Sequence, residues 1–121
     1  MPFRNLDVLD LAEQVVDQVN ALIARSTRPP LLHSRQLRDA VQSVAANIAE
    51  GFGRGTGRDR ARPLQIARGE SEEAIRHLGA NFRDNRIGPK DYWPLRNRLV
   101  VMVKMLSALI VADDPCGFHT G

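Results

Sequence analysis

The sequence predicts an all-α protein, a single-domain antiparallel up-down four-helix bundle. Three observations lead to this prediction. Four segments carry apolar residues at spacings of three and four, short breaks rich in proline and glycine separate them, and no segment alternates as a strand does. Comparable helices joined by short breaks are typical of antiparallel bundles. We therefore assign residues 1–112 to the bundle and residues 113–121, which lack periodicity, to a flexible C-terminal tail.

The first two helices are predicted at residues 5–26 and 34–50. The Pro29–Pro30 pair ends the first helix, because proline lacks an amide donor and restrains the residue before it. In the second helix we expect Ser34 to be the N-cap and Gly51 the C-cap. The stripes expected to face the core are Leu9, Ala12, Val16, Val19 and Ile23, then Leu37, Val41, Val44 and Ile48.

The third and fourth helices are predicted at residues 60–86 and 91–112. Gly69 and Gly79 interrupt the third, at about 1 kcal/mol each relative to alanine. We expect helices to cross closely at these glycines. The predicted stripes are Leu64, Ala67, Ser71, Ile75, Leu78 and Phe82, then Tyr92, Leu95, Leu99, Met102, Leu106 and Leu109. The fourth helix carries further apolar residues, which indicate burial against another subunit: Val100, Val103 and Ile110.

Composition limits the compartment and the chemistry. The single cysteine, Cys116, has no internal disulfide partner, so the expected location is the cytoplasm. No apolar run is long enough to span a bilayer. The N-terminal residues include acids where a secretory signal would be apolar. Aromatic residues make up 5% of the chain, which argues against binding of single strands by base stacking.

No motif in the chain predicts catalysis, a metal or a cofactor. The glycine-rich loop at residues 51–58 lacks the lysine of a Walker motif, and it follows a helix rather than a strand. Cys116 and His119 form a lone Cys-x-x-His, which supplies two of the four ligands of a structural zinc. No serine or cysteine has a base beside it, and no di-iron pattern repeats. We expect a protein that is not an enzyme.

Arginine dominates the charge. The chain has 17 basic and 14 acidic residues, a net charge of +3, and lysine only at positions 90 and 104. Flexible glycines would let the arginines of the loop reach a phosphate backbone, and neutralising phosphates releases counterions. A solvated loop without a ligand is the alternative. The candidate nucleic-acid-binding residues are Arg35, Arg38, Arg54, Arg58, Arg60 and Arg62.

Arg68 lies beside the apolar stripe of the third predicted helix. A guanidinium in this position needs a partner if it is buried. Glu72, four residues on, is the expected one, with Glu50 or Asn47 of the second helix as alternatives. We favour a structural role for Arg68 over contact with a ligand.

Two runs of residues resemble signatures of a known family. Residues 47–51 read Asn-Ile-Ala-Glu-Gly at the end of one helix, and residues 66–69 read Ile-Ala-Arg-Gly in the next. The chain resembles the four-helix-bundle proteins named for intervening sequences of bacterial 23S rRNA genes. It departs from their pattern at Ala45, usually proline, and at Glu70, usually serine. The motif positions that match are Asn47, Glu50, Gly51, Arg68 and Gly69.

The resemblance implies an up-down four-helix bundle that assembles as a ring, typically a homopentamer. It also relates the chain to the accessory protein of diversity-generating retroelements, which binds nucleic acid and a reverse transcriptase. We therefore expect a homo-oligomer that binds RNA or DNA non-specifically through arginine. The alternative is a protein-interaction scaffold or accessory subunit, for example of a reverse transcriptase, that does not contact nucleic acid itself.

Overall fold

The computed structural model describes residues 5–55 and 57–113, with side chains from residue 7 onward. It contains four α-helices: α1 (Asn5–Arg25), α2 (Ser34–Gly53), α3 (Ala61–Arg83) and α4 (Pro89–Asp113). A 3-10 turn, η1 (Gly57–Arg60), precedes α3. Apart from one β-bridge between Thr27 and Pro30, the described residues form no β-structure. The predicted all-α fold is confirmed.

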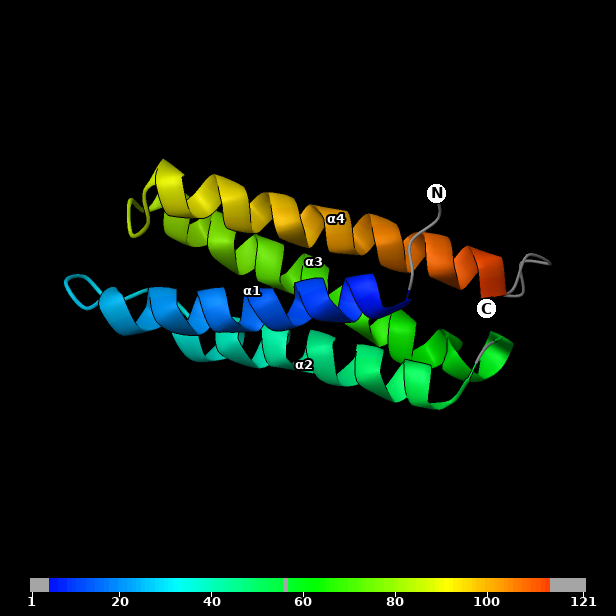
Figure 1. Cartoon of the computed structure of the whole chain (residues 1–121). Helices are drawn as coiled ribbons and strands as arrows, with labels where there is room; N and C mark the ends of the chain where they lie inside the picture. Colours follow the sequence, from blue (N-terminus) through cyan, green and yellow to red (C-terminus); the bar gives the residue numbers. More distant parts are fainter. Residues whose placement is uncertain (1–4, 56, 114–121) are drawn as a thin grey trace.

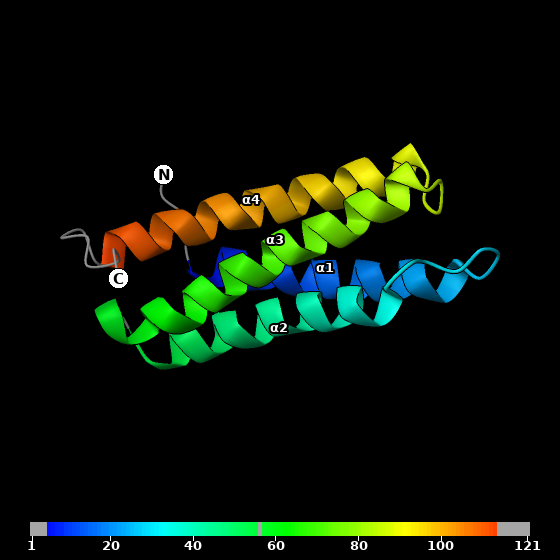
Figure 2. The same cartoon turned by 180° about the vertical axis from the view of Figure 1, so that it is seen from behind.

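The helices run alternately up and down along one axis (Figures 1 and 2). Each packs against two neighbours, so that α1 and α3 each lie between α2 and α4. The least extensive of the four interfaces is that between α1 and α4. The loops α1–α2 and α3–α4 lie at one end of the bundle, and the glycine-rich connection lies at the other (Figure 1). Within the described residues, no helix combines the length and the apolar character needed to cross a membrane.

Helical periodicity predicted the buried faces well in α2 and less well in α1. Leu37, Val41, Val44 and Ile48 are buried, as expected. In α1 the core stripe is shifted by one residue at several positions. The fully buried residues are Val8, Ala12, Val15, Val19 and Leu22, whereas Leu9, Val16 and Ile23 pack at the edge of the core.

The predicted caps of α2 are wrong. His33, at φ 52°, precedes the first helical residue, Ser34, and no side chain caps this end. At the other end the helix continues past Gly51 to Gly53. The positive φ values occur later, at Gly55 (89°) and Gly57 (81°), where the chain turns towards α3.

Candidate nucleic-acid interface

The six arginines predicted to bind nucleic acid lie at opposite ends of the bundle. Arg35 and Arg38 belong to the first turns of α2, whereas Arg54 follows its last residue. The 20 residues of α2 span about 30 Å at 1.5 Å per residue. The predicted set therefore forms two separate groups, not one patch.

At the glycine-rich end, acidic side chains compensate much of the arginine charge. Arg54 donates to Glu50 Oε2 from Nε and Nη2, at 3.0 and 2.9 Å. Arg58 and Arg62 are exposed, and Asp59 lies between them in the sequence. When Asp113 of α4 is counted, this end carries four arginines and three acids, so its net charge is close to zero.

Arg60 is buried and does not belong to the exposed arginines. Its guanidinium forms a two-pronged ion pair with Asp113, at 2.5 Å from Nε and 2.9 Å from Nη2. The two side chains are 6% and 7% exposed, and the guanidinium also lies 5.5 Å from the centre of the Phe52 ring. The sequence prediction assigned Asp113 to the tail, which is why this partner was missed. Arg60 ties the start of α3 to the end of α4 and is not available to a ligand.

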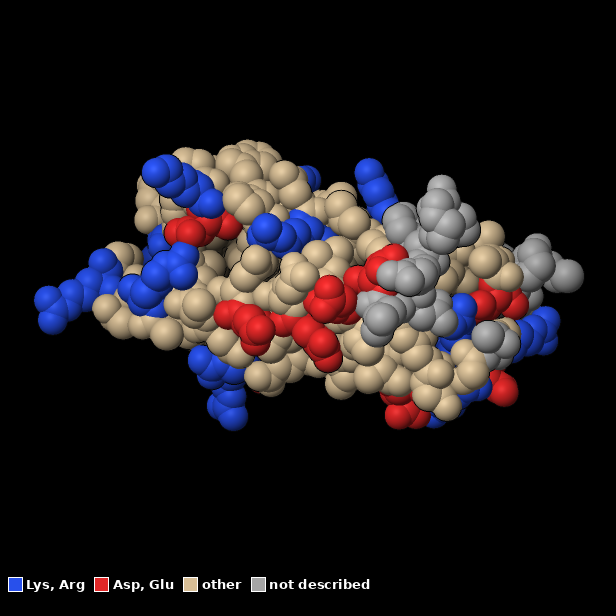
Figure 3. Space-filling model, in the orientation of Figure 1, with Lys and Arg blue, Asp and Glu red and all other residues tan. Residues whose placement is uncertain are grey.

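The opposite end of the bundle carries most of the net positive charge. We call it the basic end, and it comprises residues 25–39 and 83–98, the two loops and the helix turns beside them. These residues contain nine of the 17 basic side chains and three of the 14 acidic ones, for a net charge of +6. The rest of the chain carries a net charge of −3. Figure 3 shows basic side chains gathered at this end and acidic ones midway along α1.

The basic end keeps most of its cations at the surface. Arg25 pairs with Asp91 at 2.6 Å, and Arg86 pairs with Asp84 at 2.7 Å. The exposed side chains that form no ion pair with another described residue include Arg28, Arg35, Arg83 and Lys90. Their charge is therefore available to an anion in solution.

A buried asparagine fixes one of the two loops at the basic end. Asn81 of α3 accepts a hydrogen bond from the Leu32 amide at 2.7 Å. Its amide group donates to the carbonyl oxygens of Leu32 and His77, at 3.1 and 2.8 Å. Asn81 is fully buried, so these bonds satisfy a polar group that would otherwise be costly in the core. They also hold the arginine-bearing α1–α2 loop against α3.

Sequence reasoning missed most of the basic end, although the information was present. Arg25 and Arg28 precede the Pro29–Pro30 break, and Arg83, Arg86 and Lys90 surround the break before α4. In an antiparallel bundle the first and third connections lie at the same end. The predicted topology was therefore sufficient to bring these two clusters together.

The resemblance motif has structural contacts. Asn47 donates to the Ser43 carbonyl at 2.9 Å and to its hydroxyl at 3.1 Å. Arg68 is half-buried and donates to Ser107 Oγ of α4 at 3.3 Å. The expected partner of Arg68, Glu72, is exposed, and the hydrogen bond goes to α4 instead. Arg68 thus links α3 to α4.

The motif glycines differ in their surroundings. A Cβ atom on Gly51 would lie 3.1 Å from Leu64 Cδ2, so α2 and α3 approach closely at this point. A Cβ on Gly69 would meet nothing within 4 Å, and one on Gly79 would meet the Arg83 guanidinium at 3.2 Å. The expectation of close crossings at Gly69 and Gly79 is wrong; the close crossing is at Gly51.

A polar groove between α2 and α3 brings two histidines together. The His33 and His77 rings lie 5.6 Å apart, and His77 Nε2 lies 3.0 Å from Glu73 Oε2. A hydrogen bond from Arg76 lowers the pKa of the Glu73 carboxyl. Among residues 5–55 and 57–113, no three histidine, cysteine or acidic side chains are placed to hold a metal ion. Cys116 and His119, like the rest of the predicted tail beyond residue 113, lie outside the described residues.

The outer face of α4 exposes apolar side chains, but they are not the predicted ones. Ile110 is buried in the core, and Val100 and Val103 are half-buried. The large apolar side chains exposed on α4 are Trp93, Val101 and Val111, at 46%, 43% and 59% exposure.

Comparison with known proteins agrees with the fold and the motifs. The family model described as 23S rRNA-intervening sequence protein matches residues 4–108. The chain belongs to this family. A comparison with curated proteins finds no match.

This member of the 23S rRNA-intervening sequence protein family is similar to a solved structure from Bacteroides thetaiotaomicron. That structure is described as a protein of unknown function from the S23 ribosomal protein family. The two superpose with a TM-score of 0.78 at 23% sequence identity, over 89% of this chain and 98% of the other. At this identity the likeness supports the four-helix fold alone.

Proposed function

We propose that this protein is a non-enzymatic module that binds nucleic acid non-specifically through the phosphate backbone. The observation that carries the proposal is the segregation of charge, with a net charge of +6 at the basic end against −3 over the rest of the chain. Exposed arginines are suited to phosphate because their planar guanidinium donates two parallel hydrogen bonds. Binding of this kind reads no base and depends strongly on salt.

We further propose that the protein acts as a homo-oligomer in the cytoplasm, with a pentamer expected from the family resemblance. A ring of identical bundles repeats the basic end once per subunit. The positive fields of the copies then add over the surface that faces the nucleic acid. Such an assembly would hold a strand at several points, although each contact is weak.

The test compares two double variants with the same change in charge. Arg28→Glu with Arg35→Glu alters the basic end, and Arg58→Glu with Arg62→Glu alters the glycine-rich end. Fluorescence anisotropy with a labelled 20-mer RNA and its DNA equivalent is measured in a protein titration at each point of a salt series. Loss of two phosphate contacts should reduce the slope of log K against log salt by about 1.4 to 1.8.

For the basic-end variant we expect the slope to fall by this amount with both nucleic acids. For the glycine-rich-end variant we expect the slope to change little. A larger fall in the slope for the Arg58 and Arg62 variant would instead place the binding site at the glycine-rich loop. No binding by the wild-type protein at low salt, with the oligomer intact by light scattering, would refute the proposal.

A protein-interaction scaffold is the second candidate, and exposed apolar residues favour it. Trp93, Val101 and Val111 lie on the outer face of α4, and Ala46 and Ala49 are exposed on α2. On this proposal the partner is another protein, such as a polymerase, and the arginines maintain solubility. A partner that copurifies after nuclease treatment, and is lost in a Trp93→Ala variant, would support the scaffold. Loss of every partner on nuclease treatment would count against it.

A further inference from the structure

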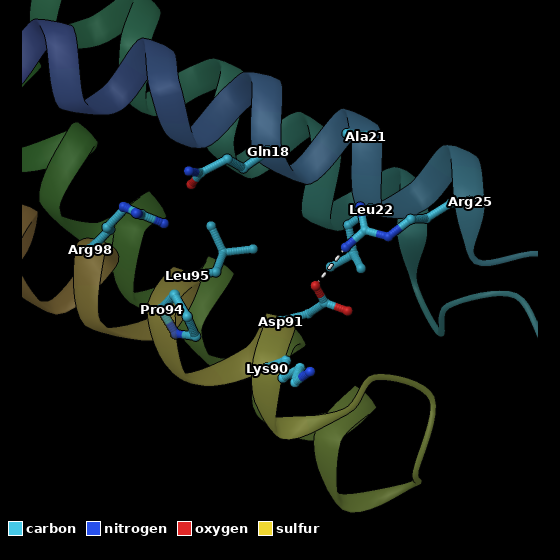
Figure 4. Close-up of a pocket in the computed structure, with 9 residues that line it drawn as sticks. All are labelled: Gln18, Ala21, Leu22, Arg25, Lys90, Asp91, Pro94, Leu95 and Arg98. Carbon is cyan, nitrogen blue, oxygen red and sulfur yellow. Dashed lines mark hydrogen bonds and ion pairs between the residues drawn. The ribbon is translucent and has the colours of Figure 1, made fainter.

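A groove of about 210 Å³ lies between α1 and α4, at the least extensive of the helix interfaces. Figure 4 shows its lining, to which α1 contributes Gln18 and Arg25 and α4 contributes Asp91 and Arg98. The 2.6 Å ion pair between Arg25 and Asp91 bridges the two helices across it. A groove of this volume suits a small ligand.

The antiparallel register places Gln18 opposite Arg98. Arg25 of α1 pairs with Asp91 of α4. Gln18 lies seven residues before Arg25 in α1, and Arg98 lies seven residues after Asp91 in α4. Seven residues are two helical turns, or about 10 Å. The groove therefore has a bridged end at Arg25 and Asp91 and a second end where an amide faces an arginine, as Figure 4 shows.

Gln18 carries an unused hydrogen-bond acceptor. Its Oε1 atom is buried and meets no donor among the described residues. Buried polar atoms are normally paired, so an unpaired one in the wall of a groove indicates the group that the groove accepts. An amide oxygen accepts, so a ligand at this point must supply an O–H or N–H donor.

The charged side chains of the groove favour an anion. Lys90 and Arg98 form no ion pair with other described residues, and the only acid in the lining, Asp91, is already paired with Arg25. Leu22 and Leu95 supply apolar surface between the charged ends. The matching ligand has an anionic group, a compact body with C–H faces, and a hydroxyl donor beside the anion.

We propose that this groove binds a ribose phosphate unit. The phosphate lies at Arg98, with a flanking phosphate at Lys90. The sugar packs over Leu22 and Leu95, and its 2′-hydroxyl donates to Gln18 Oε1. The inference deepens the proposed function and rests on it, because the groove adjoins the basic end, shares Arg25, Lys90 and Arg98 with it, and selects RNA over DNA. A 2′-hydroxyl is the group by which a protein distinguishes the two nucleic acids at a given site.

The unit has two sources, a strand of RNA or a free sugar phosphate. A strand is favoured by the exposed cations that continue from the groove onto the basic end, Arg28 and Arg35 among them. A free sugar phosphate would use the same contacts within the groove but would gain nothing from Arg28 and Arg35.

The experiment measures the ratio of affinities for a single-stranded RNA 20-mer and the DNA of the same sequence. Variants are Gln18→Met, which removes the acceptor and keeps the length of the side chain, and Arg98→Gln. Gln14→Met on the solvent face of α1 is the matched control. One hydrogen bond predicts that wild type and the control favour RNA by about fivefold. Gln18→Met should bring the ratio close to one, and Arg98→Gln should weaken RNA binding.

A second arm uses ribose 5-phosphate and 2-deoxyribose 5-phosphate in thermal shift assays. A rise in Tm with ribose 5-phosphate, absent in the two groove variants, supports the site with a free sugar phosphate as its source. A Gln18-dependent preference for RNA without this rise supports the strand.

Equal binding of RNA and DNA by the wild type overturns the inference and leaves the proposed function intact. A preference for RNA that survives Gln18→Met also overturns it. If neither nucleic acid binds, the proposed function fails, and the thermal shift with ribose 5-phosphate is then the test of whether the groove binds a sugar phosphate. No shift with ribose 5-phosphate then rejects the groove as well.

Discussion

Asn81→Ala tests whether a buried polar clamp holds the basic end together. The substitution removes the acceptor for the Leu32 amide, at 2.7 Å, and the donor to the Leu32 carbonyl, at 3.1 Å. Both Leu32 groups belong to the loop that carries Arg28, and Asn81 is fully buried on α3. The third bond, to the carbonyl of His77, lies within α3 and contributes less to the position of the loop.

The expected cost follows from the two groups that lose their partners. An unsatisfied buried donor or acceptor costs about 1–3 kcal/mol, so two partly buried ones should cost about 2–4 kcal/mol together. Unfolding entropy is about 2.1 cal/mol/K per residue, or about 0.25 kcal/mol/K for a chain of this length. We therefore expect Tm to fall by about 8–16 °C.

Thermal unfolding followed by circular dichroism measures the effect at one fixed protein concentration, because assembly would make Tm depend on concentration. Asn97→Ala is the matched control. Asn97 is exposed on α4, so the control removes the same amide and brings the same gain in helix propensity. At ~0.25 kcal/mol/K, the clamp is refuted if the Tm of Asn81→Ala falls by no more than about 3 °C beyond that of the control.

Two further predictions concern α2 and α3. Gly51→Ala should lower the free energy of unfolding by about 1–2 kcal/mol, because the new Cβ would lie 3.1 Å from core residue Leu64. Gly69→Ala should raise the free energy of unfolding by about 1 kcal/mol, because the space around Gly69 is open and alanine favours a helix. Urea titrations that give both variants the same sign would contradict this. The hydrogen bond from Arg76 lowers the pKa of Glu73 below its usual 4.5, so its stabilisation is complete above pH 4.5 and is lost as the pH falls through the lowered pKa. The difference in Tm between wild type and Glu73→Gln should therefore narrow below pH 4.5, and a difference that stays constant down to pH 2 would disprove the assignment.

Local chemistry made the four helices predictable. The 3.6-residue period and proline breaks such as Pro29–Pro30 depend on residues close together in the sequence, so the helix positions could be predicted to within a few residues. The end of α2 was less predictable: the helix continues to Gly53, and Gly51 lies inside it, where α2 approaches Leu64 of α3. In α1, adjacent apolar residues such as Val8 and Leu9 both fit the period, and the choice between them depends on the neighbouring helices.

The candidate interface was harder to predict than the fold. Arg60 belongs to the densest run of arginines in the sequence, yet it is buried because Asp113, 53 residues away, meets it at the end of α4. Arg25 and Arg98 are less conspicuous in the sequence, because each has only one other arginine within three residues, Arg28 and Arg96 respectively. They line one groove because α1 and α4 are antiparallel neighbours.

The sequence by itself determined the all-α class, four helices, a positive net charge dominated by arginine, and membership of a bundle family through two short motifs. The tertiary structure decided which arginines lie together. Residues 25–39 and 83–98 lie far apart along the chain, and the up-down topology brings them to one end. The physical reason is that helix formation depends on near neighbours in sequence, whereas electrostatic potential adds through space and is unaffected by distance along the chain.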